Sequence, residues 1–150
     1  MRAWRLQRRV YPPLGGEVAR RSGGRWNSRG VAVVYASPTL SLATLELLAH
    51  VDPDLIPDDL TAYEIDLPDG LSREAVDPGK LPADWRGPEN PRCKAIGDAW
   101  IAEGRAALLR VPSAIIPEEF NILINPSHPE AARITLVSER EFVFDPRLIR

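Results

Sequence analysis

Fifteen prolines spread through 150 residues limit this chain to short secondary-structure elements. Proline fixes its own φ angle and lacks an N–H group, so it interrupts helices and central strands. The prolines are dispersed and not tandem, which indicates many loops and excludes a polyproline tract. Because the expected strands and helices do not alternate strictly, the sequence predicts an α+β fold with a mixed or antiparallel sheet.

The apolar pattern predicts more strands than helices. One helix follows Ser37-Pro38, because serine is a good N-cap and proline suits the first helical position. A second helix is expected over 94–103, with Gly104 as its stop. Its inward residues are expected to be Ile96, Ala99, Trp100 and Ile101. The predicted strands are 31–36, 61–67, 106–111, 120–124, 134–137 and 142–144.

The composition describes one ordinary globular domain over residues 1–150. The apolar fraction is 44%, the charged fraction is 27% and the net charge is −2, which does not support binding to nucleic acid or membranes. No apolar run approaches the roughly 20 residues of a membrane span, and the N-terminus lacks the apolar core of a signal peptide. The single cysteine, Cys93, fits a reducing cytoplasm. His50 and His128 lack ligand spacing, so no metal is expected.

One acidic residue, Glu46, lies inside the otherwise apolar stretch 40–49. A helix that is apolar nearly all round is expected to be buried. Burying a carboxylate costs several kcal/mol unless a partner compensates, so Glu46 is a candidate site residue. The alternative is a structural ion pair with an arginine.

The first 29 residues are strongly basic, with eight arginines and one acid, Glu17. This segment is either a solvated face or a contact for an anionic ligand or an acidic partner segment. Within it, Gly23-Gly24-Arg25 presents a guanidinium on a glycine-led loop, and arginine suits bidentate contact with phosphate. Tyr35 ends a predicted strand and either stacks on a flat cationic ring or is an ordinary core residue.

Two serines are candidates for contact with a ligand. Ser113 falls on the core face of the strand that precedes it, where its hydroxyl needs a partner, either a ligand or the backbone. Ser127 belongs to Asn125-Pro126-Ser127-His128, which is most simply a turn, although His128 is also a candidate ligand contact.

These segments together resemble the RES-domain toxins, a family named for an arginine, a glutamate and a serine. The resemblance extends over essentially the whole chain and rests on the order and spacing of several short blocks. The blocks are Ala3-Trp4-Arg5-Leu6, Gly24-Arg25-Trp26-Asn27, Val34-Tyr35-Ala36-Ser37, Leu42-Ala43-Thr44-Leu45-Glu46, Gly97-Asp98-Ala99-Trp100, Leu109-Arg110-Val111-Pro112-Ser113-Ala114, Asn121-Ile122-Leu123-Ile124-Asn125-Pro126 and Phe144-Asp145-Pro146-Arg147.

The resemblance implies a split-sheet α+β domain like that of ADP-ribosyltransferase toxins, with NAD held in a cleft. It implies the toxin component of a bacterial type II toxin–antitoxin system. The catalytic residues would be Arg25, Tyr35, Glu46 and Ser113, with Ser113 favoured over Ser127 as the serine that faces the substrate. The NAD-binding residues would be Arg25, Trp26, Asn27, Tyr35, Asn125 and Ser127. The partner would be a helix-turn-helix antitoxin that covers the active site, in a hetero-oligomer or beside a toxin homodimer.

The chemistry of NAD cleavage suits these residue types. Nicotinamide leaves as a neutral molecule, so the reaction requires stabilisation of an oxocarbenium-like transition state and no general acid. Glu46 is expected to counter that positive charge, Arg25 to hold the pyrophosphate or ribose, and Tyr35 to pack against nicotinamide. Ser113 is expected to bond the ligand or to fix Glu46.

Three functions stay open on the sequence alone. The first is depletion of free NAD by hydrolysis or phosphorolysis. The second is transfer of ADP-ribose to a protein target. The third is an inactive module that only binds the antitoxin.

Overall fold

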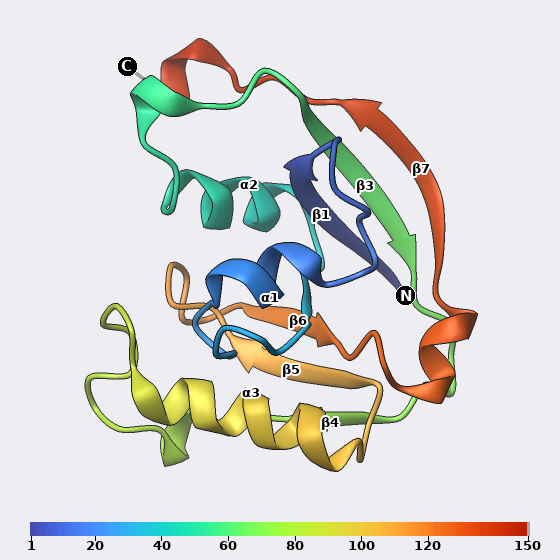
Figure 1. Ribbon diagram of the computed structural model, residues 1–150. Helices are drawn as coiled ribbons and strands as arrows, with labels where there is room; N and C mark the ends of the chain where they lie inside the picture. Colours follow the sequence, from blue (N-terminus) through green and yellow to red (C-terminus); the bar gives the residue numbers. More distant parts are fainter. Residues whose placement is uncertain (150) are drawn as a thin grey trace.

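The computed structural model describes residues 1–149, which form seven strands and three α-helices (Figure 1). The strands build two sheets. The sheets have the strand orders β1-β3-β7 and β2-β6-β5-β4. The strands are β1 Arg2–Arg8, β2 Val34–Ala36, β3 Leu60–Asp66, β4 Arg73–Ala75, β5 Leu108–Pro112, β6 Phe120–Ile124 and β7 Thr135–Glu141. The helices are α1 Glu17–Ser22, α2 Leu40–Leu48 and α3 Pro91–Glu103, with short 3-10 turns at Pro53–Leu55, Pro78–Lys80, Pro129–Arg133 and Pro146–Leu148.

The two sheets are joined where β1 runs beside the chain that follows β2. Trp4 and Ser37 form an antiparallel bridge there, with backbone N···O distances of 2.7 and 2.8 Å. The first sheet is antiparallel throughout, and the second is mixed because β4 pairs parallel to β5. The predicted α+β class with a split, antiparallel and mixed sheet is therefore confirmed.

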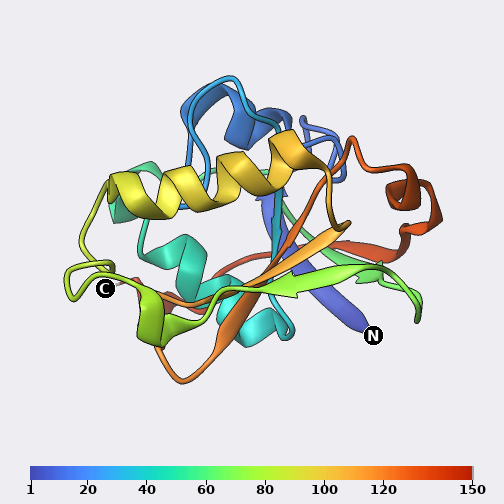
Figure 2. The ribbon, with the colours of Figure 1, turned by 90° about the horizontal axis from the view of Figure 1, so that it is seen from below.

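Buried apolar side chains form three clusters around these sheets. Between the sheets, Ala3 and Ile65 of the first meet Val34 and Ile122 of the second. The other face of the second sheet is covered by α3, which Figure 2 shows lying across β5. Helix α2 packs on the first sheet through Ala43. The helices thus cover the outer faces of a core formed between the sheets.

Helix α3 begins one turn earlier than the sequence indicated. The Asn90 side chain accepts hydrogen bonds from the N–H groups of Arg92 and Cys93, and Pro91 takes the first helical position. Gly104 ends the helix in the left-handed conformation, with φ 61°, as predicted. The predicted inward position of Ala99 is wrong, since that residue is exposed while Trp100 is fully buried.

Helix α2 differs from its prediction at its start and in its burial. Thr39, not Ser37, is the N-cap, because its side chain accepts the N–H of Leu42 at 3.1 Å while Ser37 is engaged by the bridge to Trp4. The helix is not buried all round, since Leu45 is 40% exposed. One side of α2 forms the wall of an open cleft, which explains why an acid is tolerated in it.

The C-terminal strands are the largest error in the predicted elements. The sequence indicated two short strands over 134–137 and 142–144, but one continuous strand, β7, pairs with β3. All seven of its residues are exposed because β7 is the edge of its sheet. None of the helices in residues 1–149 is both long and apolar enough to cross a membrane.

Candidate functional site

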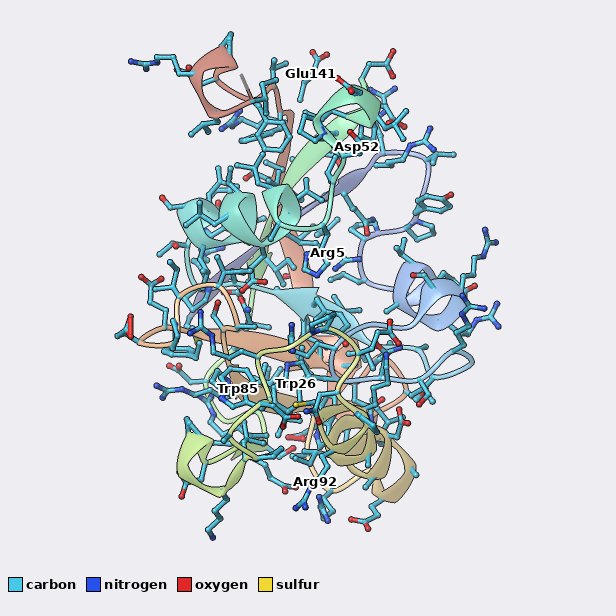
Figure 3. All side chains as sticks on the ribbon, turned by 90° about the vertical axis from the view of Figure 1, so that its left-hand side faces the viewer. Arg5, Trp26, Asp52, Trp85, Arg92 and Glu141 are labelled. Carbon is cyan, nitrogen blue, oxygen red and sulfur yellow. The ribbon has the colours of Figure 1, made fainter. Side chains whose placement is uncertain are left out.

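A cleft of about 390 Å³ opens where the two sheets diverge. Its walls come from β1, the segment 23–26, β2, α2 and the end of β5. The polar side chains on its lining are Arg5, Gln7, Arg8, Tyr11, Arg25, Tyr35, Ser37, Glu46, His50 and Asn121. Figure 3 shows Arg5 between α2 and the segment that carries Trp26. Most of the remaining lining is apolar, which is typical of a small-molecule site.

Glu46 projects from α2 into this cleft and is half-buried. Its Oε1 atom accepts two hydrogen bonds, from Ser113 Oγ at 2.6 Å and from Asn121 Nδ2 at 2.7 Å. No ion pair of Glu46 occurs among residues 1–149, so the predicted alternative of an arginine partner is wrong. The second oxygen, Oε2, makes no hydrogen bond within the described residues and is not buried.

Ser113 is fully buried just after β5 and does not line the cleft. Its Oγ accepts the N–H groups of Ile115 and Ile116 at 3.1 and 3.0 Å. These contacts leave the hydroxyl hydrogen for Glu46, whose carboxylate accepts it. Of the two roles expected for Ser113, the geometry favours fixing Glu46 over direct contact with a ligand.

Tyr35 lines the cleft with its ring, while its hydroxyl is engaged inside the protein. The hydroxyl donates to Asn27 Oδ1 at 2.6 Å and accepts the N–H of Trp26 at 3.1 Å. Burial raises the pKa of Tyr35 well above its ordinary value, so the phenol stays neutral. The side chain therefore offers the cleft an aromatic surface.

Arg25 lines the cleft and carries a charge with no acidic partner among residues 1–149. Its NH1 donates to the carbonyls of Trp85 and Gly87 at 2.7 and 2.9 Å, and its NH2 to that of Arg86 at 3.2 Å. A guanidinium has five N–H donors, so these three bonds leave two for a ligand.

Helix α3 holds the segment on which Arg25 lies. Lys94 Nζ donates to the carbonyls of Gly24 and Asn27 at 2.5 and 3.3 Å. Asp98 accepts both the N–H and the hydroxyl of Ser28, at 2.9 and 2.6 Å. The loop is therefore fixed from both sides by one helix, which keeps Arg25 and its neighbour Trp26 on the cleft wall.

Arg5 is the main site residue that the sequence interpretation did not assign. Its side chain is only 9% exposed and lines the cleft, with Nε donating to Gln7 Oε1 at 2.8 Å and NH1 to the Tyr35 carbonyl at 2.7 Å. Burial lowers the pKa of Arg5 to about 10, which leaves it charged at neutral pH. No clear signal in the sequence marked it, because alternation along residues 2–8 makes Trp4 and Leu6 the apolar face and places Arg5 on the other face.

Asn125 and Ser127, two of the predicted NAD-binding residues, lie away from the cleft. The buried Asn125 side chain accepts the N–H of Ser127 at 2.9 Å, so this segment is a turn. His128 lines a separate hollow with Pro126 and Ile134. Asn27 is buried and supports Tyr35 from behind, whereas Trp26 lines the cleft itself.

The site brings together a carboxylate, two guanidinium groups and an aromatic ring; within residues 1–149, one carboxylate oxygen has no hydrogen bond and neither guanidinium has an acidic partner. Buried cationic charge without a carboxylate is costly, and an anionic ligand would compensate it. A carboxylate beside such groups suits a reaction in which positive charge develops near a bound anion.

Comparison with known proteins supports this description. The model of the RES domain matches residues 2–145. A "Prs ADP-ribosylating toxin" of Sphingobium sp. is 42% identical over 154 residues, covering 98% of this chain and 96% of the relative. A "Toxin Res" of Pseudomonas putida is 37% identical over 147 residues, covering 97% of each. A chain of the M. tuberculosis MbcT–MbcA toxin–antitoxin complex has the same fold, with a TM-score of 0.79 at 18% identity over 95% of this chain and 84% of that one.

Proposed function

The chain belongs to the RES domain family, and from this premise we propose that it is a toxin of a toxin–antitoxin system that cleaves the nicotinamide–ribose bond of NAD. The ADP-ribosyl group passes to water or phosphate, so that the protein depletes cellular NAD. The names of the relatives support the toxin role, and the cleft supports the reaction. The setting we propose is the cytoplasm, where NAD is available.

The observation that carries the proposal is the geometry of Glu46. Ser113 and Asn121 both donate to Oε1, and this leaves Oε2 free at a cleft with mostly apolar walls. When the bond from ribose C1′ to nicotinamide breaks, positive charge develops on the sugar. A fixed carboxylate oxygen stabilises that charge, and mutational loss of one preorganised stabilising group typically costs about 10²–10³ in kcat.

The other cleft residues suit the remainder of NAD. Arg5 and Arg25 supply two cationic groups for the pyrophosphate, to which guanidinium binds in bidentate fashion. The ring of Tyr35 provides a surface for the cationic nicotinamide ring. Because nicotinamide departs as a neutral base, none of these residues needs to act as a general acid. No step of this scheme calls for a metal.

A second function, transfer of ADP-ribose to a protein, is favoured by the name of the 42% identical relative, an ADP-ribosylating toxin. Both reactions break the same bond and need the same groups on the NAD side. They differ only in the acceptor, so the same cleft serves either. An inactive module is a weaker alternative, since Arg25, Tyr35 and Glu46 all line the cleft.

The antitoxin also belongs to the proposal. We expect a helix-turn-helix protein to cover the cleft and so exclude NAD, in keeping with the complex in which the similar fold occurs. Purified toxin should regain NAD cleavage when this partner is removed by denaturation and refolding.

Nicotinamide release from NAD by the purified protein, with and without phosphate, tests the reaction. We expect release by the wild type and a loss of at least about 100-fold in Glu46→Gln. Glu139→Gln removes an exposed acid of β7 and should be fully active as the matched control. Radiolabel from the adenylate part of NAD that stays on protein would favour ADP-ribose transfer. Release unaffected by Glu46→Gln would contradict the assignment of Glu46.

A further inference from the structure

We infer that Asn121 is a positioning residue that fixes the carboxylate of Glu46 and thereby selects the oxygen that meets the substrate. The inference rests on the proposed function, because it concerns how Glu46 acts in that reaction. It adds to the expected site a residue that the predicted catalytic and NAD-binding sets did not contain.

Asn121 lies near the start of β6, opposite Val111 of β5, and is 9% exposed at the cleft wall. Its Nδ2 donates to Glu46 Oε1 at 2.7 Å, and its Oδ1 accepts the hydroxyl of Ser37 at 2.6 Å. The two ends of one amide are therefore both engaged. A carboxylate only accepts hydrogen bonds, so the amide must present its N–H₂ group to Glu46.

Ser37 anchors the other end of the amide, whose orientation the carboxylate of Glu46 selects. It is buried, and its backbone N–H and carbonyl pair with Trp4 at the junction of the two sheets. The hydroxyl is thus held in a fixed place and donates to Asn121 Oδ1. A reversed amide would turn its oxygen toward the Glu46 carboxylate, and two acceptors would then face each other.

The two donors to Oε1 act together on the plane of the carboxylate. The terminal torsion of a glutamate is broad and permits rotation when a single bond holds the group. Ser113 reaches Oε1 from the end of β5, and Asn121 reaches it from β6. With Oε1 holding two donors, Oε2 is the oxygen with free accepting capacity in the cleft.

Asn121→Asp tests this role with almost no change of shape, because it replaces the donor by a second carboxylate. We expect kcat for nicotinamide release to fall by about 10- to 100-fold, toward the loss seen for a missing preorganised donor. The dissociation constant for NAD should change less than about 3-fold, since Asn121 acts on Glu46. Ser37→Ala should give a smaller loss of kcat, about 3- to 10-fold, because the amide keeps its donor to Glu46 but loses the hydrogen bond that anchors its other end.

A double-mutant cycle separates positioning from a general structural role. Asn121→Ala should lower the rate in the wild type but have little further effect on the residual rate of Glu46→Gln, since residues that act as a unit are not additive. Equal fold losses in both backgrounds would overturn the inference. If Asn121→Asp does not fold, two other measurements test the inference. They are the kcat of Ser37→Ala and a double-mutant cycle of Asn121→Ser with Glu46→Gln.

The control for this experiment is the wild type itself. A wild-type protein that binds NAD but releases no nicotinamide would overturn the proposed function. A wild type that is active beside an Asn121→Asp variant of unchanged kcat would overturn this inference alone.

Discussion

Each polar side chain of the cleft uses some of its atoms in hydrogen bonds within the protein and leaves others available to a ligand. This division predicts different effects of mutation at each residue. Tyr35 uses its hydroxyl on Asn27 and on the N–H of Trp26, and offers the cleft only its ring. Arg5 and Arg25 keep donors free, while Glu46 keeps one oxygen free. A ligand therefore meets cationic groups, one carboxylate oxygen and an aromatic face.

Tyr35→Phe should retain nicotinamide release within about 5-fold of the wild type, because the ring surface remains. It should lower the free energy of unfolding by about 1–3 kcal/mol, since two buried polar groups lose their partner. Tyr35→Ala should lose at least about 10-fold in kcat/KM in addition. Steady-state kinetics and denaturant unfolding measure the two effects. A Tyr35→Phe variant as inactive as Tyr35→Ala would show that the hydroxyl takes part in the reaction.

Arg5→Met should weaken NAD binding by about 10-fold or more, because it removes a buried cation that faces the cleft. The free energy of unfolding should change by less than about 2 kcal/mol, since an apolar group of similar size also removes the cost of burying the charge. Titration calorimetry with NAD and Glu46→Gln as the background gives the affinity. Arg9→Met, at an exposed residue of the same basic segment, is the control, and equal weakening in both variants would count against a specific role.

At the level of elements, α3 fixes much of the geometry of the site although none of its residues lines the cleft. Lys94 and Asp98 hold the segment that contains Arg25, and Gly97 allows that segment to approach the helix. A Cβ atom at Gly97 would lie 1.7 Å from the carbonyl oxygen of Trp26. The helix and the loop can therefore pack at this distance only with glycine between them.

Gly97→Ala should destabilise the protein by about 1–3 kcal/mol through this clash, although alanine favours a helix by about 1 kcal/mol over glycine. Displacement of the loop should also reduce nicotinamide release. Gly104→Ala is the matched control, because that glycine has a φ of 61° but nothing within 4 Å of its Cβ position. It should cost about 1 kcal/mol without loss of activity. Thermal denaturation and kinetics would refute this account if Gly97→Ala matched its control.

The sequence predicted the interior elements better than the edges. The strand 120–124 and the stop at Gly104 are confirmed, because an apolar run and a glycine cap are local signals. β1 and β4 were not predicted. Charged and polar residues interrupt the apolar residues of β1, and two of the three residues of β4 are charged. β7 was divided into two, because its charged centre hid a continuous exposed strand whose pairing with β3 is set by tertiary structure.

For the molecule as a whole, the family and the fold class predicted from the sequence are confirmed. The roles of Arg25, Tyr35, Glu46 and Ser113 stay predictions, although the structure brings these residues to one cleft or directly behind it. Arg5 and Asn121 were missed because their positions depend on how two sheets diverge. The spacing of residues along the chain does not reveal that junction, where Trp4 of one sheet forms a bridge to Ser37 beside the other.

NAD binding across this junction should stabilise the whole fold. In Glu46→Gln, which should bind NAD without turning it over, the free energy of unfolding should rise by about 2.7 kcal/mol at an NAD concentration of 100 times the dissociation constant. Thermal denaturation at increasing NAD concentration measures this effect. The same titration with Arg5→Met in the Glu46→Gln background should need about 10-fold more NAD for an equal shift, and a midpoint independent of NAD would argue against binding.

The fully exposed strand β7 leaves the edge of its sheet open to pairing with another strand, including that of a second copy. Twofold pairing of the whole strand with its own copy would set Leu136 opposite Arg140 and Val137 opposite Glu139, with neither apolar nor ionic matches. Shifts of one or two residues toward the C-terminus set Glu139 against itself or against Glu141, whereas equal shifts toward the N-terminus set Val137 or Leu136 against itself. Like charges directly opposite are unfavourable in a sheet. The charged C-terminal half of β7 therefore opposes pairing of this open edge with its own copy, and Leu136 and Val137 limit the matching registers to the start of the strand.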